Sequence, residues 1–207
     1  MLRAYHQEKM TDEAVFSLYY RKLPSSRNYL IAAGLASVLD FLESFRFSSD
    51  ELDYLSSLDE FDIDFIDYLS EFRFEGDVWA MPEGTPCFPE EPLLEVVAPL
   101  DQAQVIESAV MNQVHFQSVL AAKGSRVVRA AGKRKVVDFG LRRMHGADAA
   151  VKAARSFYLA GAGATSNMAA GHIYGIPVTG TMAHSYIQAH SDEREAFRKF
   201  VEIYPST

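Results

Sequence analysis

The chain has 207 residues, of which 48% are hydrophobic and 12% aromatic, and its formal net charge at pH 7 is -8. This composition predicts a globular protein with one large or two small cores, and the acidity argues against a nucleic-acid-binding surface, which normally carries an excess of Lys and Arg. One cysteine excludes an internal disulfide, and no apolar run approaches the roughly 20 residues that cross a bilayer, so we expect a cytoplasmic protein without a signal peptide or membrane anchor.

The N-terminal part predicts one strand followed by three helices. Alternating apolar and polar residues, many of them aromatic or β-branched, predict a half-buried strand over 14–21. Apolar residues at helical spacing predict an amphipathic helix over 29–45. Acidic residues open two shorter helical patterns, 50–56 and 62–72, whose aromatic-rich faces we expect to pack on a sheet.

Between residues 76 and 100 the apolar period changes from about 3.6 to 2, which indicates strands. Prolines and a glycine divide this stretch into three segments that we expect to be antiparallel: 77–81, 85–88 and 93–99. Asp101 is expected to cap a long helix that ends near Lys123. The predicted buried stripe of this helix consists of Ala103, Ile106, Val110, Val114 and Gln117.

After this helix the pattern alternates between strand and helix, which is typical of a parallel α/β unit. The predicted elements are strands at 135–141 and 176–182 and helices at 147–161, 166–175 and 192–204, the last with Phe197, Phe200, Val201 and Tyr204 on one face. A closed eight-stranded α/β barrel needs about 250 residues, so this part predicts either a small open sheet or part of a barrel. We expect an N-terminal α+β domain over 1–133 and an α/β domain over 134–207.

Two adjacent arginines follow the predicted strand 135–141 in the segment FGLRRMHGADA. Ligands of α/β proteins collect at the C-terminal ends of strands, and guanidinium groups form paired hydrogen bonds with phosphate or carboxylate oxygens. Arg142 and Arg143 are therefore candidate anion-binding residues. Alternatively, they are solvated loop charges or ion-pair partners of Asp138 and Asp148.

The segment GAGATSNMAAGHIYGIP leads from small residues into a predicted helix. Backbone N–H groups exposed at a helix N-terminus favour an anion, which makes Ser166 and Asn167 candidate phosphate-binding residues. The alternative is that both residues only cap the helix.

A further candidate lies in GTMAHS, at the end of the predicted strand 176–182. His184 comes three residues after Thr181, so an imidazole and a hydroxyl can face one pocket. An imidazole can transfer a proton, bind a metal or accept a phosphoryl group. A metal site is poorly supported, because no second ligand lies at a metal-binding spacing, and a histidine without function in the core or a loop stays the alternative.

A series of segments carries a resemblance to a known family. In chain order they are RNYLIAAGL, FRFEGDVWAMPEGTPCF, EPLLEVVAPLDQAQVIES, DFGLRRMHGADAA and GATSNMAAGHIYGIPVTGTMAHS, followed by an acidic helix start. This series closely resembles nicotinate phosphoribosyltransferases over nearly the whole chain. The resemblance implies an N-terminal α+β domain joined to an irregular α/β (TIM-like) barrel, as in type II phosphoribosyltransferases.

The resemblance also implies an activity and roles for individual residues. Members of the family couple ATP hydrolysis to transfer of ribose 5-phosphate from phosphoribosyl pyrophosphate onto nicotinate, giving nicotinate mononucleotide for NAD biosynthesis. His184 matches the phosphate-accepting histidine of the family, Thr181 matches a residue close to nicotinate, and Arg142 and Arg143 match arginines near the substrate anions. Phe139, which precedes the two arginines in the chain, and Ser185, which follows His184, complete the predicted substrate site. We expect Mg²⁺ to arrive with the phosphates and not to be held by a dedicated protein cage.

The sequence departs from the family pattern at both ends. Members begin with a segment whose aromatic side chain stacks on nicotinate, and its counterpart would precede Met1. They also continue beyond the counterpart of Pro205 into further barrel strands, with another substrate arginine and a glycine-rich phosphate-binding loop. The resemblance therefore implies the N-terminal half of the enzyme. Because members look like head-to-tail dimers, we expect a homodimer or association with the missing half.

Two alternatives stay open. The chain is either part of an enzyme or a truncated, non-catalytic relative that acts as an assembly module with a partner chain. Within the enzyme class, nicotinamide and quinolinate are alternative substrates. Quinolinate carries a second carboxylate and would call for more cationic residues than Arg142, Arg143 and Lys123 obviously supply, whereas nicotinamide lacks the anion.

Overall fold

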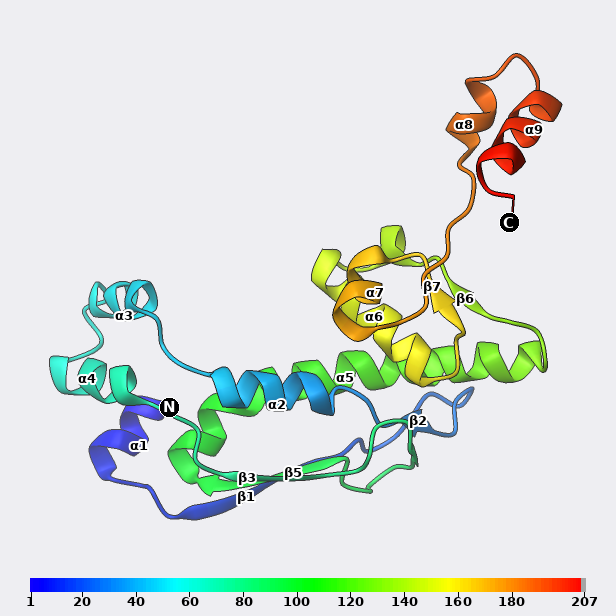
Figure 1. The fold of residues 1–207 in the computed structure, drawn as a ribbon. Helices are drawn as coiled ribbons and strands as arrows, with labels where there is room; N and C mark the ends of the chain where they lie inside the picture. The colour runs from blue at the N-terminus through cyan, green and yellow to red at the C-terminus, as the bar shows by residue number, and fades with distance from the viewer. Residues whose placement is uncertain (206–207) are drawn as a thin grey trace.

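The computed structural model describes residues 1–205, which are organised around one long helix, α5 (Leu100–Ala131) (Figure 1). A small antiparallel sheet and helix α2 (Leu35–Ser44) lie along α5, and three short helices gather near its N-terminal end. An α/β unit packs on α5, and a final pair of helices projects away from the rest. The fold is therefore mixed α/β, as predicted.

Three strands form the sheet beside α5: β1 (Glu13–Leu18), β5 (Leu94–Pro99) and β3 (Asp77–Ala80). Their order is β1-β5-β3 and both pairs are antiparallel, with Val96 of β5 lying between Phe16 of β1 and Val78 of β3. The predicted strands 77–81 and 93–99 are confirmed. The strand predicted over 14–21 is confirmed only for its first part, because β1 ends at Leu18.

A second, two-stranded sheet pairs β2 (Leu30–Ile31) with β4 (Pro86–Cys87). The segment predicted over 85–88 is therefore a strand, but the single helix predicted over 29–45 is wrong at its start, since α2 begins only at Leu35. Gly34 separates β2 from α2 with a φ of 101°, and a Cβ there would lie 2.7 Å from the backbone oxygen of Gln113 on α5. The chain crosses α5 so closely that only glycine fits at this turn.

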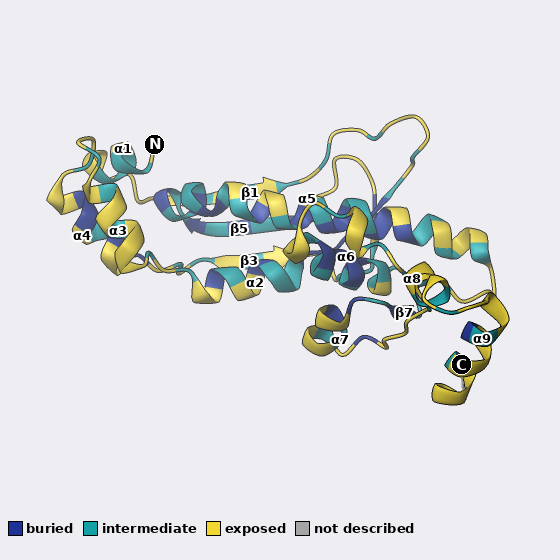
Figure 2. Ribbon diagram, turned by 90° about the horizontal axis from the view of Figure 1, so that it is seen from above, coloured by how far each residue is buried: buried dark blue, intermediate teal, exposed yellow. Residues whose placement is uncertain are grey.

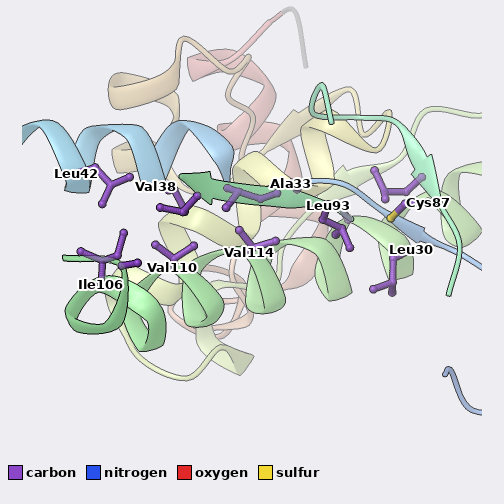
Figure 3. Packing of buried hydrophobic residues seen from close by; sticks show 14 of the residues in the cluster. Leu30, Ala33, Val38, Leu42, Cys87, Leu93, Ile106, Val110 and Val114 are labelled. Atoms are coloured by element: carbon purple, nitrogen blue, oxygen red, sulfur yellow. The ribbon is translucent and has the colours of Figure 1, made fainter. Parts of the chain in front are cut away.

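The main core lies between the sheet, α2 and α5 (Figure 3). Val38 and Leu42 of α2 face the buried side of α5, and both are at most 4% exposed. The predicted stripe of α5 is confirmed, because all its members are buried: Ala103, Ile106, Val110, Val114 and Gln117. The helix continues beyond Lys123, its expected end, to Ala131.

Three helices lie near the N-terminal end of α5: α1 (Leu2–Glu8), α3 (Ser49–Ser56) and α4 (Ile63–Glu71). Helices α3 and α4 confirm the prediction, and the side chains of Ser48 and Asp62 cap them. The expected packing of the α4 aromatic face on a sheet is wrong. Tyr68 stacks on His6 of α1 with ring centroids 4.4 Å apart, and Phe72 meets Phe45 edge-on at 5.6 Å. These aromatic rings pack on one another, and Phe45 also packs against the main core.

The capping role expected for Asp101 is also corrected. Pro99 is the N-cap of α5, and Asp101 lies in the first turn with 4% exposure. One carboxylate oxygen accepts a hydrogen bond from the Tyr68 hydroxyl at 2.7 Å, and the other accepts one from the backbone N–H of Gln102 at 2.9 Å. Asp101 therefore joins α4 to α5 at the positive end of the helix dipole.

The α/β unit contains β6 (Val137–Asp138), α6 (Ala147–Leu159), β7 (Ala164–Thr165) and α7 (Met168–Tyr174). Strands β6 and β7 are parallel, and Thr165 forms a parallel bridge with Val178. The helices predicted over 147–161 and 166–175 are confirmed. The strands predicted over 135–141 and 176–182 are much shorter than expected: the first is β6, and the second is a single bridge at Val178. No closed barrel forms within residues 1–205. Residues 206–207 lie outside the described part of the chain. The domain boundary after residue 133 stays a prediction.

Helix α6 crosses α5 at close range. Its face toward α5 consists of small buried residues, and Gly124 of α5 lies opposite Phe157 and Ala160. A Cβ at Gly124 would be 2.9 Å from the Phe157 ring. The glycine therefore allows α6, and with it the α/β unit, to sit directly on α5.

The chain ends in α8 (His184–Gln188) and α9 (Glu193–Ile203), which pack on each other. Figure 1 shows this pair set apart from the α/β unit at the end of an extended segment. Helix α9 confirms the prediction over 192–204, but α8 replaces the expected loop. Figure 2 shows both helices largely exposed; Phe200 packs on Tyr186, whereas Phe197, Val201 and Tyr204 are 44 to 53% exposed. None of the helices described here combines the length and the apolar content needed to cross a membrane.

Candidate functional site

Three chain segments of the α/β unit leave the small sheet at the same edge. Strand β6 ends at Asp138, β7 ends at Thr165, and Val178 is bridged to Thr165 in the parallel direction. The backbone N–H of Ser166 donates to the carbonyl of Asp138 at 2.8 Å, and that of Thr179 donates to the carbonyl of Thr165 at 3.0 Å. Because the carboxyl ends of parallel strands meet at one edge, the three segments that follow form a shared surface.

Asp138 lies at the centre of this edge and joins two of the segments. Its Oδ1 accepts a hydrogen bond from the backbone N–H of Gly140, and its Oδ2 accepts one from the hydroxyl of Thr165, both at 2.8 Å. Thr165 is 1% exposed, and its hydroxyl oxygen also accepts from the backbone N–H of Asn167 at 3.1 Å. These bonds fix the turn after β6 relative to the turn after β7.

Asn167 caps α7 and keeps one donor free. Its Oδ1 accepts a hydrogen bond from the backbone N–H of Ala170 at 3.2 Å. This oxygen therefore caps the helix, as the alternative interpretation predicts. The side chain is 3% exposed, and within residues 1–205 its Nδ2 has no hydrogen-bond partner. A buried amide donor without an acceptor costs about 1–3 kcal/mol, which an acceptor at this edge would remove. Ser166, the neighbouring candidate, is half-buried and precedes the cap.

Arg142 and Arg143 lie in the turn that follows β6. They end a single 3-10 turn, η1 (Leu141–Arg143), and both are exposed. Among the described residues no ion pair involves either arginine, so the alternative pairing with Asp138 or Asp148 is not observed. Both guanidinium groups are therefore free to meet an anion at this edge.

Phe139 connects the same turn to the interior. It is 45% exposed and contributes to the lining of a cavity of about 170 Å³ between β6, the end of α5 and Phe157 of α6. Lys123 lines the same cavity. The structure thus brings five of the predicted site residues to one edge of the α/β unit: Phe139, Arg142, Arg143, Ser166 and Asn167.

The remaining predicted residues lie on the segment that leaves this edge. Thr181 is exposed in the extended stretch before α8, and His184 and Ser185 are the first two residues of α8, also exposed. Helix α8 packs on α9, and no hydrogen bond or ion pair in the described chain joins His184 to either arginine. The Thr181 hydroxyl, the His184 imidazole and the arginines therefore do not form one closed pocket within residues 1–205, where α8 lies apart from the α/β unit (Figure 1).

A partly buried ion pair ties the α/β unit to the N-terminal part. Arg155 of α6 donates to both carboxylate oxygens of Glu83, at 2.9 and 2.6 Å. Glu83 also accepts a hydrogen bond from the backbone N–H of Gly34 at 2.6 Å, and the Arg155 guanidinium lies 5.6 Å from the ring of Tyr174. Hydrogen bonding to Glu83 raises the pKa of Arg155 despite burial. One pair thus fixes α6 and α7 relative to α2.

Sequence reasoning missed two residues at the strand edge, Asp138 and Thr165. The sequence indicates Asp138 only as an alternative ion-pair partner of the arginines, whereas its carboxylate accepts hydrogen bonds from the Gly140 backbone and the Thr165 hydroxyl. The signal was available, because an acidic residue at the carboxyl end of a short apolar strand is placed where α/β proteins build their sites. Thr165 precedes the candidates Ser166 and Asn167 and gave no separate signal.

The donor groups of the described chain do not form a metal site. Within residues 1–205 no group of three or more His, Cys, Asp or Glu side chains is arranged to hold a metal ion. At the strand edge both oxygens of the Asp138 carboxylate already accept hydrogen bonds from the protein.

Comparison with known sequences gives a consistent result. The sequence model of the nicotinate phosphoribosyltransferase (NAPRTase) N-terminal domain matches residues 1–115. Nicotinate phosphoribosyltransferase pncB2 of Mycobacterium tuberculosis is 54% identical over 207 residues, which are 100% of this chain and 45% of the relative. Nicotinate phosphoribosyltransferase of Bacillus subtilis is 40% identical over 199 residues, 96% of this chain and 40% of the relative. The chain thus spans less than half the length of these relatives.

Comparison with solved structures agrees. A crystal structure of human nicotinic acid phosphoribosyltransferase superimposes with a TM-score of 0.84 at 34% identity and covers 92% of this chain and 39% of the human chain. Nicotinate-nucleotide pyrophosphorylase from Pyrococcus furiosus gives a TM-score of 0.78 at 22% identity, over 98% of this chain and 44% of that protein. At that identity the second likeness concerns the fold alone.

Proposed function

Because the chain belongs to the nicotinate phosphoribosyltransferase family, we propose that it supplies the N-terminal half of an enzyme that transfers ribose 5-phosphate from phosphoribosyl pyrophosphate to nicotinate. The product would be nicotinate mononucleotide, a precursor in NAD biosynthesis. The half consists of an α+β domain and the first units of an irregular TIM-like barrel. A cytoplasmic location is part of the proposal.

The observation that carries the proposal is the strand edge around Asp138. Within residues 1–205 the two exposed arginines form no ion pair and the buried Asn167 amide has a donor without an acceptor, and all three residues follow the carboxyl ends of the parallel strands β6 and β7. Nicotinate presents a carboxylate, and phosphoribosyl pyrophosphate presents phosphate groups. Paired arginine donors fit the planar carboxylate, and the amide of Asn167 fits a phosphate oxygen. Phe139 would contribute an apolar surface beside the pyridine ring.

His184 is proposed to accept a phosphoryl group from ATP. In that step a ring nitrogen would attack the γ-phosphorus, an N–P bond would form, and the bond to the bridging oxygen would break with release of ADP. Hydrolysis of the N–P bond would then draw the transfer toward nucleotide. The exposure of the ring at the start of α8 leaves it accessible to ATP, and Thr181 and Ser185 would supply neighbouring hydroxyl groups.

Magnesium is proposed to arrive with the phosphates of ATP and phosphoribosyl pyrophosphate. Mg²⁺ prefers oxygen ligands and commonly binds through substrate phosphates with one or two carboxylates. Both carboxylate oxygens of Asp138 already accept hydrogen bonds that hold two turns in place. We therefore assign the binding of substrate charge at this edge to the arginines, and the binding of Mg²⁺ to the substrate phosphates. When bound, Mg²⁺ would neutralise the charge of the departing pyrophosphate.

A complete site requires chain that lies outside these 207 residues. The chain covers 45% of the Mycobacterium tuberculosis relative, and α8 is not held against the strand edge by any other element described. We therefore propose that turnover requires association with a second copy or with the missing half.

The phosphoryl-transfer step is tested with ATP labelled at its γ-phosphate. We expect the chain to acquire label that is stable in base and labile in acid, as a phosphoryl group on histidine is. His184→Asn should abolish this label. His190→Asn is the matched control, because His190 lies near the other end of α8 and its ring is engaged with the Tyr186 carbonyl at 2.7 Å. Equal labelling of the two variants would contradict the role of His184.

The substrate is tested by calorimetric binding of three pyridines. We expect nicotinate to bind more tightly than nicotinamide, and the Arg142→Met/Arg143→Met variant to lose this preference, because the carboxylate then has no paired donors. Tighter binding of quinolinate than of nicotinate would reassign the substrate.

A second candidate function is a non-catalytic assembly module. It is favoured by one observation, the separation of the α8–α9 pair from the strand edge. Such a module would form a stable complex with a partner chain but would show neither labelling by ATP nor binding of nicotinate. Sedimentation of the chain with and without ligands separates the two candidates.

A further inference from the structure

The Asp138 carboxylate receives hydrogen bonds from two different segments of the chain. Its Oδ1 accepts from the backbone N–H of Gly140, and its Oδ2 accepts from the hydroxyl of Thr165, both at 2.8 Å. Both partners are donors, and an ionised carboxylate accepts at both oxygens and donates at neither. A side-chain amide of the same shape cannot satisfy both neighbours, because one of its two ends is a donor.

The bond to Asp138 also fixes the direction of the Thr165 hydroxyl. A hydroxyl group carries one proton and two lone pairs. The proton of Thr165 points to Asp138, so a lone pair is left to accept the backbone N–H of Asn167 at 3.1 Å. Thr165 is 1% exposed, so bulk water does not offer its hydroxyl another partner. The carboxylate of Asp138 thereby decides which way these hydrogen bonds run.

Asn167 is held by the last bonds of this series. Its backbone N–H donates to Thr165, its Oδ1 accepts from the backbone N–H of Ala170 at 3.2 Å, and the residue is 3% exposed. These bonds leave Nδ2 pointing in one direction, and within residues 1–205 it has no acceptor. Helix α7 has only seven residues, so the geometry of its first turn depends on such contacts with other segments.

We propose that Asp138 is a positioning residue for the anion site, because its carboxylate orients the Asn167 amide through the Thr165 hydroxyl. Through Gly140 the same carboxylate also holds the turn that carries the two arginines. One side chain thus sets the positions of the donors that follow β6 and of the donor that follows β7, without touching the ligand. The inference rests on the proposed function for the identity of the ligand, an anion with carboxylate or phosphate oxygens.

The surrounding backbone fits this role of the carboxylate. A Cβ at Gly140 would lie 2.9 Å from Oδ1 of Asp138 and 3.1 Å from Cε of Met144. A side chain at position 140 would therefore push the carboxylate away from its two donors. The backbone N–H of Ser166 donates to the carbonyl of Asp138 at 2.8 Å. Both the main chain and the side chain of Asp138 thus bond to the segment that follows β6 or β7.

The proposal predicts an effect on anion binding that is opposite in sign to the effect of charge alone. Neutralising a carboxylate near a site for anions should strengthen binding if only charge repulsion mattered. In Asp138→Asn the new amide should turn its oxygen to Gly140, because a backbone N–H cannot rotate, and its NH₂ group to Thr165. The buried hydroxyl proton then has no acceptor, and the lone pair that receives the Asn167 N–H is disturbed. Binding should therefore weaken.

The series of hydrogen bonds is tested by amide hydrogen exchange in the 207-residue chain. In Asp138→Asn the backbone N–H groups of Asn167 and Ala170 should exchange about tenfold faster than in the wild type, although neither donates to Asp138. Thr165→Val should have the same effect, whereas Thr165→Ser keeps the hydroxyl and should exchange as the wild type does. The N–H of Thr179 donates to the Thr165 carbonyl at 3.0 Å, so its unchanged exchange shows that the strands stay paired.

The effect on the ligand is tested by calorimetry with two probes, nicotinate and inorganic pyrophosphate. Asp138→Asn and Gly140→Ala should each weaken binding about tenfold, and the second variant does so with the negative charge still present. Asp148→Asn is the matched control, because it removes the same charge from an exposed residue in the first turn of α6. It should leave binding unchanged or slightly tighter. Urea denaturation shows that each variant is folded at the temperature of the titration.

Two results would overturn the proposal. One is wild-type exchange at Asn167 and Ala170 in Asp138→Asn, and the other is binding of either anion by this variant that equals or exceeds binding by the wild type. A wild-type chain that binds neither probe would contradict the proposed function instead, and the exchange measurement would then decide the positioning role by itself. If Asp138→Asn does not fold, Thr165→Val and Gly140→Ala test the same role, and wild-type exchange and binding in both would overturn it.

Discussion

The ion pair between Arg155 and Glu83 gives the sharpest stability prediction. Arg155→Met keeps an apolar stem beside Tyr174 but leaves the Glu83 carboxylate without its charged partner. Removing one member of a fully buried pair costs about 3–5 kcal/mol. The Arg155 and Glu83 side chains are 16% and 14% exposed, so water screens part of the remaining charge. We therefore expect a loss of about 2–3 kcal/mol in the free energy of unfolding at pH 7, or about 4–10 °C in Tm.

The same variant should show a characteristic pH dependence. Burial by itself would raise the pKa of Glu83, but the hydrogen bonds and charge of Arg155 outweigh it and hold the pKa below its ordinary value of 4.5. A carboxyl group with a lowered pKa stabilises the folded chain above that ordinary value, and this stabilisation disappears as the pH falls through the lowered pKa. The difference in the free energy of unfolding between wild type and Arg155→Met should therefore shrink as the pH falls below the ordinary carboxyl value of 4.5 and through the lowered pKa of Glu83.

Urea denaturation followed by circular dichroism across this pH range is the assay. Lys199→Met is the matched control, because it breaks the solvent-screened surface pair with Glu195 and should leave the free energy of unfolding nearly unchanged. The double variant Glu83→Gln/Arg155→Met should be less destabilised than the sum of the two single variants, since no buried charge is left unpaired. A free energy of unfolding equal to that of the wild type at pH 7, or a difference that stays constant down to pH 3, would refute the reasoning.

Three further predictions concern the core. Gly34→Ala should lower the free energy of unfolding by about 2–4 kcal/mol, because φ is positive and the new methyl group would lie 2.7 Å from a backbone oxygen of α5. Gly84→Ala is the control: φ is also positive but the space is open, so the loss should be about 1 kcal/mol. Thermal unfolding compares the two variants. Tyr68→Phe should lower the free energy of unfolding in urea by about 1–2 kcal/mol because the buried Asp101 loses its side-chain donor, and an unchanged value would contradict that hydrogen bond. Burial raises the pKa of the Cys87 thiol to about 11, so a thiol reagent at pH 8 should modify it only after denaturation; rapid reaction of the native chain would show that the thiol is accessible.

Helices with a clear apolar stripe and a local cap could be predicted from the sequence. The stripe of α5 from Ala103 to Gln117 and the cap of α4 at Asp62 both act within a few residues, so they are visible in the sequence. The start of α2 was not visible, because Leu30 and Ile31 continue the helical spacing. They become a strand only through β4, more than fifty residues away in the chain. The partners of the α4 aromatic residues were equally hidden, since α1 carries no strong pattern of its own.

For the candidate site, too, local sequence indicated some features, and packing between distant elements decided the others. The rule that ligands collect at strand ends indicated Arg142 and Arg143, and the exposed N–H groups of a helix N-terminus indicated Ser166 and Asn167; the structure places these segments on one edge. Their roles stay predictions. Whether His184 lies near the arginines depends on the position of α8, which is decided by packing against other elements and not by the sequence GTMAHS. No local pattern carries this information.

The crossing of α5 and α6 at Gly124 has a consequence for how this family can vary. Any side chain at that position would act as a wedge between the two helices and tilt α6 outward, and β6 and β7, which are connected to α6 at either end, would tilt with it. The distance between the long helix and the turn after β6 thus depends on the missing side chain of Gly124, which lines the same cavity as Phe139. Substitution there should be tolerated only where Phe157 shrinks in compensation, so the two positions are expected to change together in the course of evolution.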